Sequence, residues 1–266
     1  MKRSLSVLGA AVIASLSLAT AASADVRPGV QTLTEGAQCT GNFIFSDGSS
    51  TYLGQAAHCS STSESTTTDG CEAEVRPIGT RVEIEDAANP GTFPVVGTIV
   101  YSSWNTMKAK GETIGSDVCR YNDFALIKLP AGTATSPTVP FWGGPSGIGA
   151  PASGSNVYSY GNSSLRFGIE VLKPKRGVHV QTLGNGWSHT VYTVTPGIPG
   201  DSGSGFLTST GKAMGVLSTV AVAPFPLSNQ VSDLGKAMAY MKANAPEFAG
   251  VNLVNGTTAF NGGRLL

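Results

Sequence analysis

Charged side chains are scarce in this chain. Lysine, arginine, aspartate and glutamate make up 13% of its 266 residues, whereas an average domain has roughly 25%. The 17 basic residues balance the 17 acidic ones, so no excess of positive charge favours binding to nucleic acid or to an anionic membrane. Serine, threonine, asparagine and glycine must therefore cover much of the surface, which fits either a secreted hydrolase or a secreted binding module.

Metal-binding side chains are also scarce, with three histidines and four cysteines. The sequence contains no Cys-x-x-Cys pair, and only His58 adjoins a cysteine, which argues against a zinc site. We expect neither a metal nor an organic cofactor. An even number of cysteines in an exported chain instead indicates two disulfide bonds. The four residues, which allow three pairings, are Cys39, Cys59, Cys71 and Cys119.

A long hydrophobic run occurs only near the start of the chain. Charged residues at 1–3 are followed by an apolar run over 5–22 and by Ala-Ser-Ala at 22–24. This order is typical of a signal peptide, and a membrane anchor is the alternative. We predict that residues 1–24 are removed and that the mature, secreted protein starts at Asp25. No later run is long enough to span a bilayer, so we expect no membrane partner after cleavage.

The most informative stretch is Pro-Gly-Asp-Ser-Gly-Ser-Gly-Phe at residues 199–206. Glycine permits a sharp turn that exposes backbone amides. The amides of Gly200 and Ser202 are then able to converge on one point, as an oxyanion hole requires. The Gly-x-Ser-x-Gly elbow of α/β-hydrolases does not fit, because Ser204 stands where the second glycine belongs. The alternative is that Ser202 is simply one serine in a glycine-rich turn.

A nucleophilic serine needs a base, and His58 is the best candidate. It ends an apolar run and is followed by Cys59. A histidine pKa of about 6.5 allows proton uptake and return near neutral pH. His179 and His189 have no supporting motif, so we expect both to be structural.

The orienting carboxylate is predicted to be Asp123. It opens the apolar, strand-like run at 124–129, so its carboxylate is expected to be partly buried. A buried carboxylate needs a hydrogen bond, and an imidazole N–H is a suitable donor. Asp117 is the runner-up, since it lacks the following apolar strand.

These residues resemble the chymotrypsin/trypsin family of serine proteases, in particular its secreted bacterial members. The resemblance rests on Ala-Ala-His-Cys at 56–59, Asn-Asp-Phe-Ala-Leu-Ile-Lys-Leu at 122–129 and Gly-Asp-Ser-Gly at 200–203, in the family's order. It covers about residues 37–245. It implies a triad in which Ser202 attacks, His58 is the base and Asp123 orients it, with the oxyanion hole at Gly200 and Ser202.

The same resemblance implies two disulfide bonds. The first joins Cys39 to Cys59, and the second then joins Cys71 to Cys119. It also implies a protein or peptide substrate, and we expect a monomer.

The resemblance leaves the partner of Asp201 open. In animal members the corresponding aspartate pairs with a newly cut amino terminus, which forms the oxyanion hole. The usual Ile-Val-Gly-Gly start is absent here, so we do not expect activation of that type. Arg27 and Arg166 are the candidate partners.

Three residues are assigned to substrate binding by the resemblance. Pro196 occupies the floor position of the primary pocket, Ser218 lies on the strand that binds the substrate backbone, and Val220 replaces a glycine and narrows the pocket. No acid lies in residues 190–200. We therefore expect a preference for small or medium apolar side chains.

Many short strands between glycine and proline turns indicate an all-β sandwich or barrel. The resemblance selects two packed six-stranded antiparallel barrels, at residues 25–133 and 134–245, with a helix at the end of the second. Residues 246–266 form a C-terminal extension in which 251–254 either add a strand or fray.

Local patterns predict the individual elements. Strands are expected at 39–45, 50–53, 74–78, 81–85, 95–101, 124–129, 156–161, 177–181, 190–194 and 213–220, with Asp47-Gly48 turning the first hairpin. A helix is expected at 232–245, capped by Ser232 or Asp233. Residues 25–36 are expected to be a polar arm, 104–118 an irregular connection and 130–137 a linker.

The leading hypothesis is thus a secreted serine endopeptidase. A secreted binding protein with an idle triad is the alternative from a different class. An esterase with the same triad is a third possibility, because acyl transfer to water is the same chemistry.

Overall fold

A computed structural model of the protein describes residues 24–62, 67–220 and 226–266, and at Val220 the backbone alone. The predicted signal peptide therefore lies outside the described residues apart from Ala24. Within the described ranges, no helix has the length and apolar character needed to cross a membrane.

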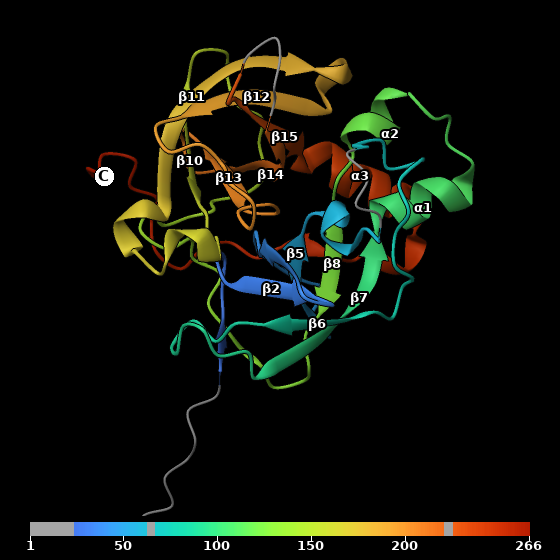
Figure 1. The fold of residues 1–266 in the computed structure, drawn as a ribbon, viewed down its shortest axis with the longest axis horizontal. Helices are drawn as coiled ribbons and strands as arrows, with labels where there is room; N and C mark the ends of the chain where they lie inside the picture. The colour runs from blue at the N-terminus through green and yellow to red at the C-terminus, as the bar shows by residue number, and fades with distance from the viewer. Residues whose placement is uncertain (1–23, 63–66, 221–225) are drawn as a thin grey trace, which may run out of the picture.

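The first half of the chain, joined by one strand from the C-terminal extension, forms an eight-stranded antiparallel sheet in the order β16-β4-β5-β8-β7-β6-β2-β3 (Figure 1). Its strands are β2 (Gln31–Thr34), β3 (Ala37–Thr40), β4 (Ile44–Ser46), β5 (Thr51–Gln55), β6 (Arg81–Ile84), β7 (Val95–Ser102), β8 (Ala125–Lys128) and β16 (Asn252–Leu253). Aliphatic side chains on its inner face, including Leu53, Ile99 and Ile127, form a buried cluster. The extension predicted at 251–254 thus adds a strand, which pairs with β4.

The second half closes into a six-stranded antiparallel barrel in the order β10-β11-β12-β15-β14-β13. Its strands are β10 (Asn156–Tyr160), β11 (Pro174–Leu183), β12 (Ser188–Thr193), β13 (Gly205–Thr208), β14 (Ala213–Val220) and β15 (Asn229–Asp233). Alternate residues such as Val157, Phe206 and Met214 fill the interior, as the two-residue period of a strand requires. The all-β fold class predicted from the sequence is confirmed.

Helices are few and short. They are α1 (Ser103–Lys110), α2 (Asp117–Tyr121) and α3 (Leu234–Asn244), with 3-10 turns η1 (Ala57–Ser60), η2 (Ser164–Arg166), η3 (Glu170–Leu172), η4 (Gly184–Gly186) and η5 (Pro246–Phe248). The predicted C-terminal helix is confirmed as α3. The carboxylate of Asp233 caps it by accepting from the Lys236 amide at 2.7 Å, as predicted.

Four local predictions were wrong. Residues 25–36 are not a free arm but contain β1 (Asp25–Val26) and β2, because Val26 and Val30 are buried in the first core. Residues 130–137 are not a plain linker, since β9 (Ala134–Thr135) pairs with β1.

The other two errors concern residues 74–78 and 104–118. Residues 74–78 form no strand and contribute one isolated bridge, between Ser61 and Val75. Residues 104–118 contain most of α1 and the start of α2. Trp104 and Met107 anchor α1 by burial, and two apolar anchors are too few to produce a readable helical period.

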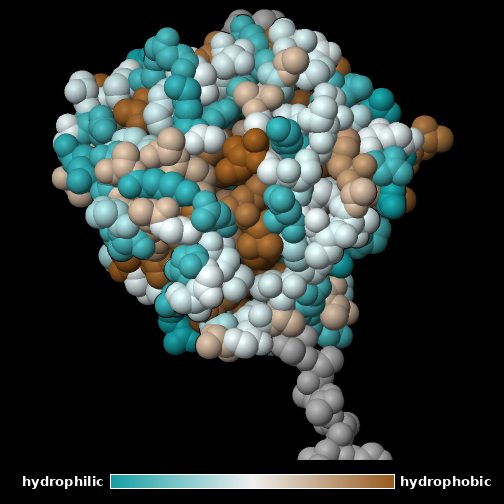
Figure 2. Space-filling view, turned by 180° about the vertical axis from the view of Figure 1, so that it is seen from behind, coloured by the Kyte–Doolittle hydropathy of each residue, from teal (hydrophilic) through white to brown (hydrophobic). Residues whose placement is uncertain are grey.

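The surface reflects the low charge of the sequence. Figure 2 shows pale, weakly polar residues between scattered hydrophilic ones, with a hydrophobic strip running down the middle of the face seen from behind. This pattern agrees with a surface carried largely by small polar residues.

Candidate active site

His58 and Asp123 meet at one end of the first sheet. β5 and β8 are paired with Gln55 opposite Ala125, so η1, which follows β5, lies beside the residues that precede β8. The His58 Nδ1 atom is 2.6 Å from Asp123 Oδ2, and the His58 amide donates to Asp123 Oδ1 at 2.9 Å. Because a carboxylate only accepts, Nδ1 carries the proton and Nε2 is left to act as a base.

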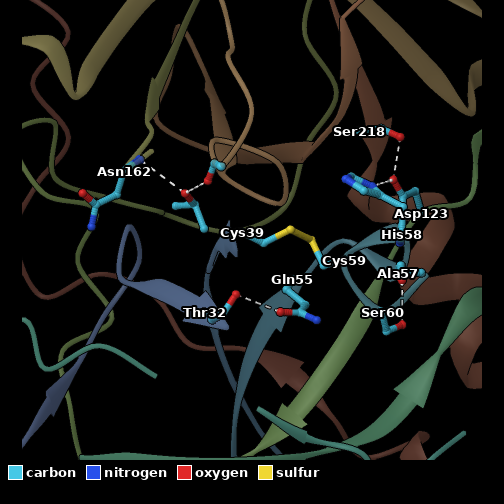
Figure 3. The surroundings of a disulfide bond; sticks show 12 residues. Thr32, Cys39, Gln55, Ala57, His58, Cys59, Ser60, Asp123, Asn162 and Ser218 are labelled. Carbon is cyan, nitrogen blue, oxygen red and sulfur yellow. Dashed lines mark hydrogen bonds and ion pairs between the residues drawn. A yellow bond between two sulfur atoms is a disulfide. The ribbon is translucent and has the colours of Figure 1, made fainter. Parts of the chain in front are cut away.

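Two residues of the second barrel complete the surroundings of Asp123. The Ser218 hydroxyl donates to Asp123 Oδ2 at 2.5 Å, and the Asp123 amide donates to Ser232 Oγ at 3.1 Å. Figure 3 shows the His58 ring and the Ser218 hydroxyl meeting at the Asp123 carboxylate. The aspartate is 2% exposed, so these donors replace the water that it loses on folding.

The charges of this pair support one another. Burial alone would lower the pKa of His58, but the Asp123 carboxylate outweighs burial and raises it. Burial likewise would raise the pKa of Asp123, but His58 and the Ser218 hydroxyl outweigh it and lower that pKa. The arrangement therefore favours an imidazole that gains a proton while the carboxylate stays ionised, as a general base requires.

Ser202 is held between the two halves. The Thr40 amide donates to the Ser202 carbonyl at 2.7 Å, and the Gly203 amide donates to the Leu217 carbonyl at 2.8 Å. Gly203 has a φ of +86°, and a Cβ there would lie 2.6 Å from the Thr40 carbonyl and 3.1 Å from the Ala56 amide nitrogen. Only glycine fits this position, so the loop at residues 199–204, called the serine loop below, packs directly against the segment that leads into His58.

The amides of Gly200 and Ser202 face away from the protein's own acceptors. The Pro199 carbonyl accepts from the Ser163 hydroxyl at 2.5 Å, and the Asp201 carbonyl accepts from the Ser204 amide at 3.1 Å. In a trans peptide the N–H points opposite to the C=O. The two predicted oxyanion-hole amides are thus turned away from these contacts, and no described residue accepts a hydrogen bond from either.

Asp201 is fully buried and paired with two cations. Its Oδ2 atom accepts from Arg166 at 2.6 Å and lies 2.9 Å from Lys175 Nζ, while its Oδ1 accepts from the Ser163 amide at 3.1 Å. Arg166, one of the two candidates, is therefore a partner of Asp201. Arg27, the other candidate, is not among the described contacts of Asp201. Burial would raise the pKa of Asp201, but Arg166 and Lys175 outweigh it and lower that pKa.

A cavity of about 360 Å³ opens beside Ser202. Among the described residues its lining is mostly apolar and carries no charged side chain: Gly197, Ile198, Pro199, Ser202, Leu217, Ser218 and Thr219. Ser218 thus lines this cavity as well as holding Asp123. Pro196 is not in the lining, and its carbonyl instead accepts from Arg166 at 3.1 Å. The side chain of Val220 lies outside the described part of the structure.

Two disulfide bonds brace the first half. They join Cys39 to Cys59 and Cys71 to Cys119, which is the predicted pairing. Figure 3 shows the first beside the turn that carries His58. The sulfur atoms are already bonded, so the neighbourhood of His58 offers no thiolate to a metal.

His179 and His189 lie elsewhere, inside the second barrel. Their rings are 5.3 Å apart, and His189 Nε2 is 2.8 Å from Asp233 Oδ2. Both are 2% exposed and neither lines the cavity beside Ser202. Burial and the neighbouring His189 lower the pKa of His179.

Solved bacterial protease structures have the same architecture. Thermobifida fusca Protease A aligns with a TM-score of 0.54 and 18% sequence identity, over 88% of this chain and 100% of that one. Nocardiopsis protease aligns with a TM-score of 0.50 and 16% identity, over 86% and 99%. The chain has the trypsin-like serine protease fold.

A third solved structure is a glutamic acid specific serine protease that uses a histidine triad in substrate binding. It aligns with a TM-score of 0.50 and 15% identity, over 86% of this chain and 100% of that one. No family model matches the sequence, and no curated protein matches it. The fold that the resemblance implied is therefore confirmed by these structures.

Several contacts of the site could not be read from the sequence. Lys175 is fully buried, and nothing in its Pro-Lys-Arg-Gly surroundings in the sequence indicates this burial. Ser163 contacts the Pro199 carbonyl in the serine loop, and Ser232 accepts from the Asp123 amide. Both are ordinary serines in a chain rich in serine, and only the fold brings them to these partners. No local signal distinguishes them.

Proposed function

We propose that the protein is a secreted serine endopeptidase that works through an acyl-enzyme. The observation that carries this proposal is the 2.6 Å contact between His58 and Asp123 beside a serine loop whose two amides are turned away from internal acceptors. A structural serine turn would need neither feature. The two disulfide bonds fit an oxidising, extracellular environment, and residues 1–24 are the proposed signal peptide.

The proposed reaction has two halves. Ser202 Oγ bonds to the carbonyl carbon of the peptide while its proton passes to His58 Nε2, and the oxyanion accepts from the amides of Gly200 and Ser202. His58 then gives the proton to the leaving amine, and the C–N bond breaks. Water attacks the acyl-enzyme by the same route and restores Ser202. Asp123 holds the ring in the required tautomer throughout.

The cavity beside Ser202 supports a preference for small or medium apolar side chains at the cleaved bond. Ile198, Pro199 and Leu217 offer apolar contacts, and the described part of the lining provides no charge to bind an acidic or basic side chain. Thr219 and Ser218 add only hydroxyl groups. A buried charge without a partner is costly, so a charged side chain should bind poorly here.

The test is cleavage of peptide anilides that differ only in the residue before the bond. We expect alanine, valine or leucine to be preferred over arginine and glutamate. Ser202→Ala should abolish all cleavage, whereas the control Ser204→Ala should fold and keep measurable cleavage. A dominant preference for arginine or glutamate would refute the proposed specificity. Cleavage of esters but never of anilides would favour the esterase reading, and no turnover by the folded protein would favour the idle binding protein.

A further inference from the structure

The cluster beneath the serine loop contains one more positive charge than negative. Arg166, Lys175 and Asp201 are 7%, 0% and 0% exposed. Both cations contact the same atom, Asp201 Oδ2. One carboxylate therefore faces two cations, where a single cation would suffice to neutralise it.

No other carboxylate in the described residues balances the second cation. The charged groups that face Lys175 are Asp201 from the serine loop and Arg166 from η2. Glu170 from η3 points instead to Lys173 Nζ at 2.6 Å and to the Tyr160 hydroxyl at 2.8 Å. The excess charge is thus confined to the space behind the serine loop.

The position of this charge matters for the proposed reaction, on which the inference rests. Asp201 lies between Gly200 and Ser202 in the sequence, so the carboxylate that holds the cluster belongs to the residue between the two amides that would bind the oxyanion. Arg166 and Lys175 also contact the Pro196 carbonyl, at 3.1 and 3.5 Å, and so tie the loop to β11. A fixed positive charge in a dry site stabilises negative charge that develops nearby, without any rearrangement.

We propose that Lys175 is a positioning residue whose buried, uncompensated charge stabilises the oxyanion at the Gly200 and Ser202 amides. The side chain touches Asp201 and not the substrate. For an assumed separation of about 8 Å and an effective dielectric constant of about 20, Coulomb's law gives a unit charge an effect of about thirty-fold on the rate. The contribution exists only in the transition state, so it is expected in kcat and not in KM.

A change of pH removes the same charge. Burial lowers the pKa of Lys175, and the Asp201 carboxylate only partly offsets this. As pH rises through that pKa, Lys175 becomes neutral and the excess charge disappears. Activity is therefore expected to fall at alkaline pH through Lys175, at a lower pH than an exposed lysine would give. Arginine keeps its charge at all accessible pH values.

The test compares Lys175→Met, Lys175→Arg and the matched control Lys173→Met, which alters a neighbouring buried lysine that contacts Glu170. We expect Lys175→Met to lower kcat about thirty-fold with KM unchanged. Lys175→Arg should keep most of kcat and lose the alkaline decline, and Lys173→Met should behave like wild type. Equal losses in the Met and Arg variants, or an unchanged kcat in Lys175→Met, would overturn the proposal.

A second measurement covers the case in which Lys175→Met does not fold. The affinity of wild type for a peptide boronate, which carries the oxyanion charge, should weaken as pH rises, and the affinity of Lys175→Arg should not. Parallel pH profiles in the two proteins would overturn the role of Lys175. If wild type itself neither cleaves peptides nor binds the boronate, the proposed function has failed, which is a different result.

Discussion

The two halves of the molecule hold the residues of the proposed triad by different means. The eight-stranded sheet presents His58 and Asp123 and contains both disulfide bonds. The closed barrel presents Ser202 and has no cysteine at all after Cys119. The loop that carries Ser202 is anchored instead by the buried charge of Asp201, which pairs with Arg166 and Lys175.

This difference separates two ways of fixing a loop. A disulfide acts mainly by restricting the unfolded chain, and it does so at any pH at which it stays oxidised. A buried ion cluster holds the native geometry directly, and it fails when one charge is removed and the others are left without a partner. The His58 half should therefore be sensitive to reduction, and the Ser202 half to the loss of single charges.

The largest effect on activity among these comparisons is expected from Asp123→Asn. This substitution keeps the shape of the side chain but removes the negative charge of the carboxylate. The amide can donate to His58 and so fix the wrong tautomer, and kcat should fall about 10⁴-fold, as in the general triad. The Asp123 carboxylate raises the pKa of His58, so its removal lowers that pKa. The acid limb of the remaining activity, which reports protonation of His58, should therefore move to lower pH. The pH profile of kcat/KM measures both, and Asp117→Asn is the control. If Asp117→Asn loses activity and Asp123→Asn keeps it, the assignment of Asp123 as the orienting carboxylate is wrong.

Among substitutions of single charges in the second half, Asp201→Asn should lower the free energy of unfolding most. It leaves Arg166 and Lys175 buried without a carboxylate, at a cost of roughly 3–5 kcal/mol in the free energy of unfolding. Urea unfolding measures this cost, with Glu83→Gln on the exposed face of β6 as the control. A change below 1 kcal/mol, similar to that of the control, would mean that the cluster does not anchor the loop.

Removing each disulfide in turn should sharpen the contrast. The closed segments span 20 and 48 residues, which corresponds to about 3 and about 4 kcal/mol of unfolding free energy. Loss of the Cys39–Cys59 bond should cost more activity, because Cys59 lies next to His58 in η1, although it costs less stability. Urea unfolding and kcat of the paired serine variants test this. The reverse ranking for activity would contradict the bracing of the histidine turn.

The smallest effect is expected where the halves meet. Ser218→Ala removes the hydroxyl that donates to Asp123 Oδ2 at 2.5 Å, while His58 still holds the carboxylate. A lost hydrogen bond to a charged group is worth about 1.5–3 kcal/mol, so kcat should fall by roughly ten- to a hundredfold. Steady-state kinetics beside Ser153→Ala, an exposed serine, would check it. No change would show that the second barrel does not help to hold Asp123.

The sequence predicted the parts of the site that depend on local motifs. His58, Asp123 and Ser202 each lie in a short pattern that can be read without the fold, and Arg166 was one of two candidates for Asp201. Lys175 could not be found in this way. A lysine is almost never fully buried unless a partner neutralises its charge, and a partner distant in sequence leaves no local signal. Its partner here, Asp201, is 26 positions further along the chain.

The same reasoning explains the errors in the fold. β1 pairs with β9, more than a hundred residues away, and two-residue strands carry no readable alternation. β16 was left open between a strand and a frayed end because its pairing with β4 joins opposite ends of the chain. The long strands β7, β10 and β14 were predicted because each is a run of five or more residues without a proline or a charged residue.

The most direct test of the proposed enzyme is labelling with a fluorophosphonate, followed by mass spectrometry of the peptide that contains Ser202. We predict one label per molecule on Ser202, none on Ser204, and no label in Ser202→Ala or His58→Ala. Absence of labelling in a folded wild type with both disulfides intact would contradict the account, because an activated serine cannot escape this reagent.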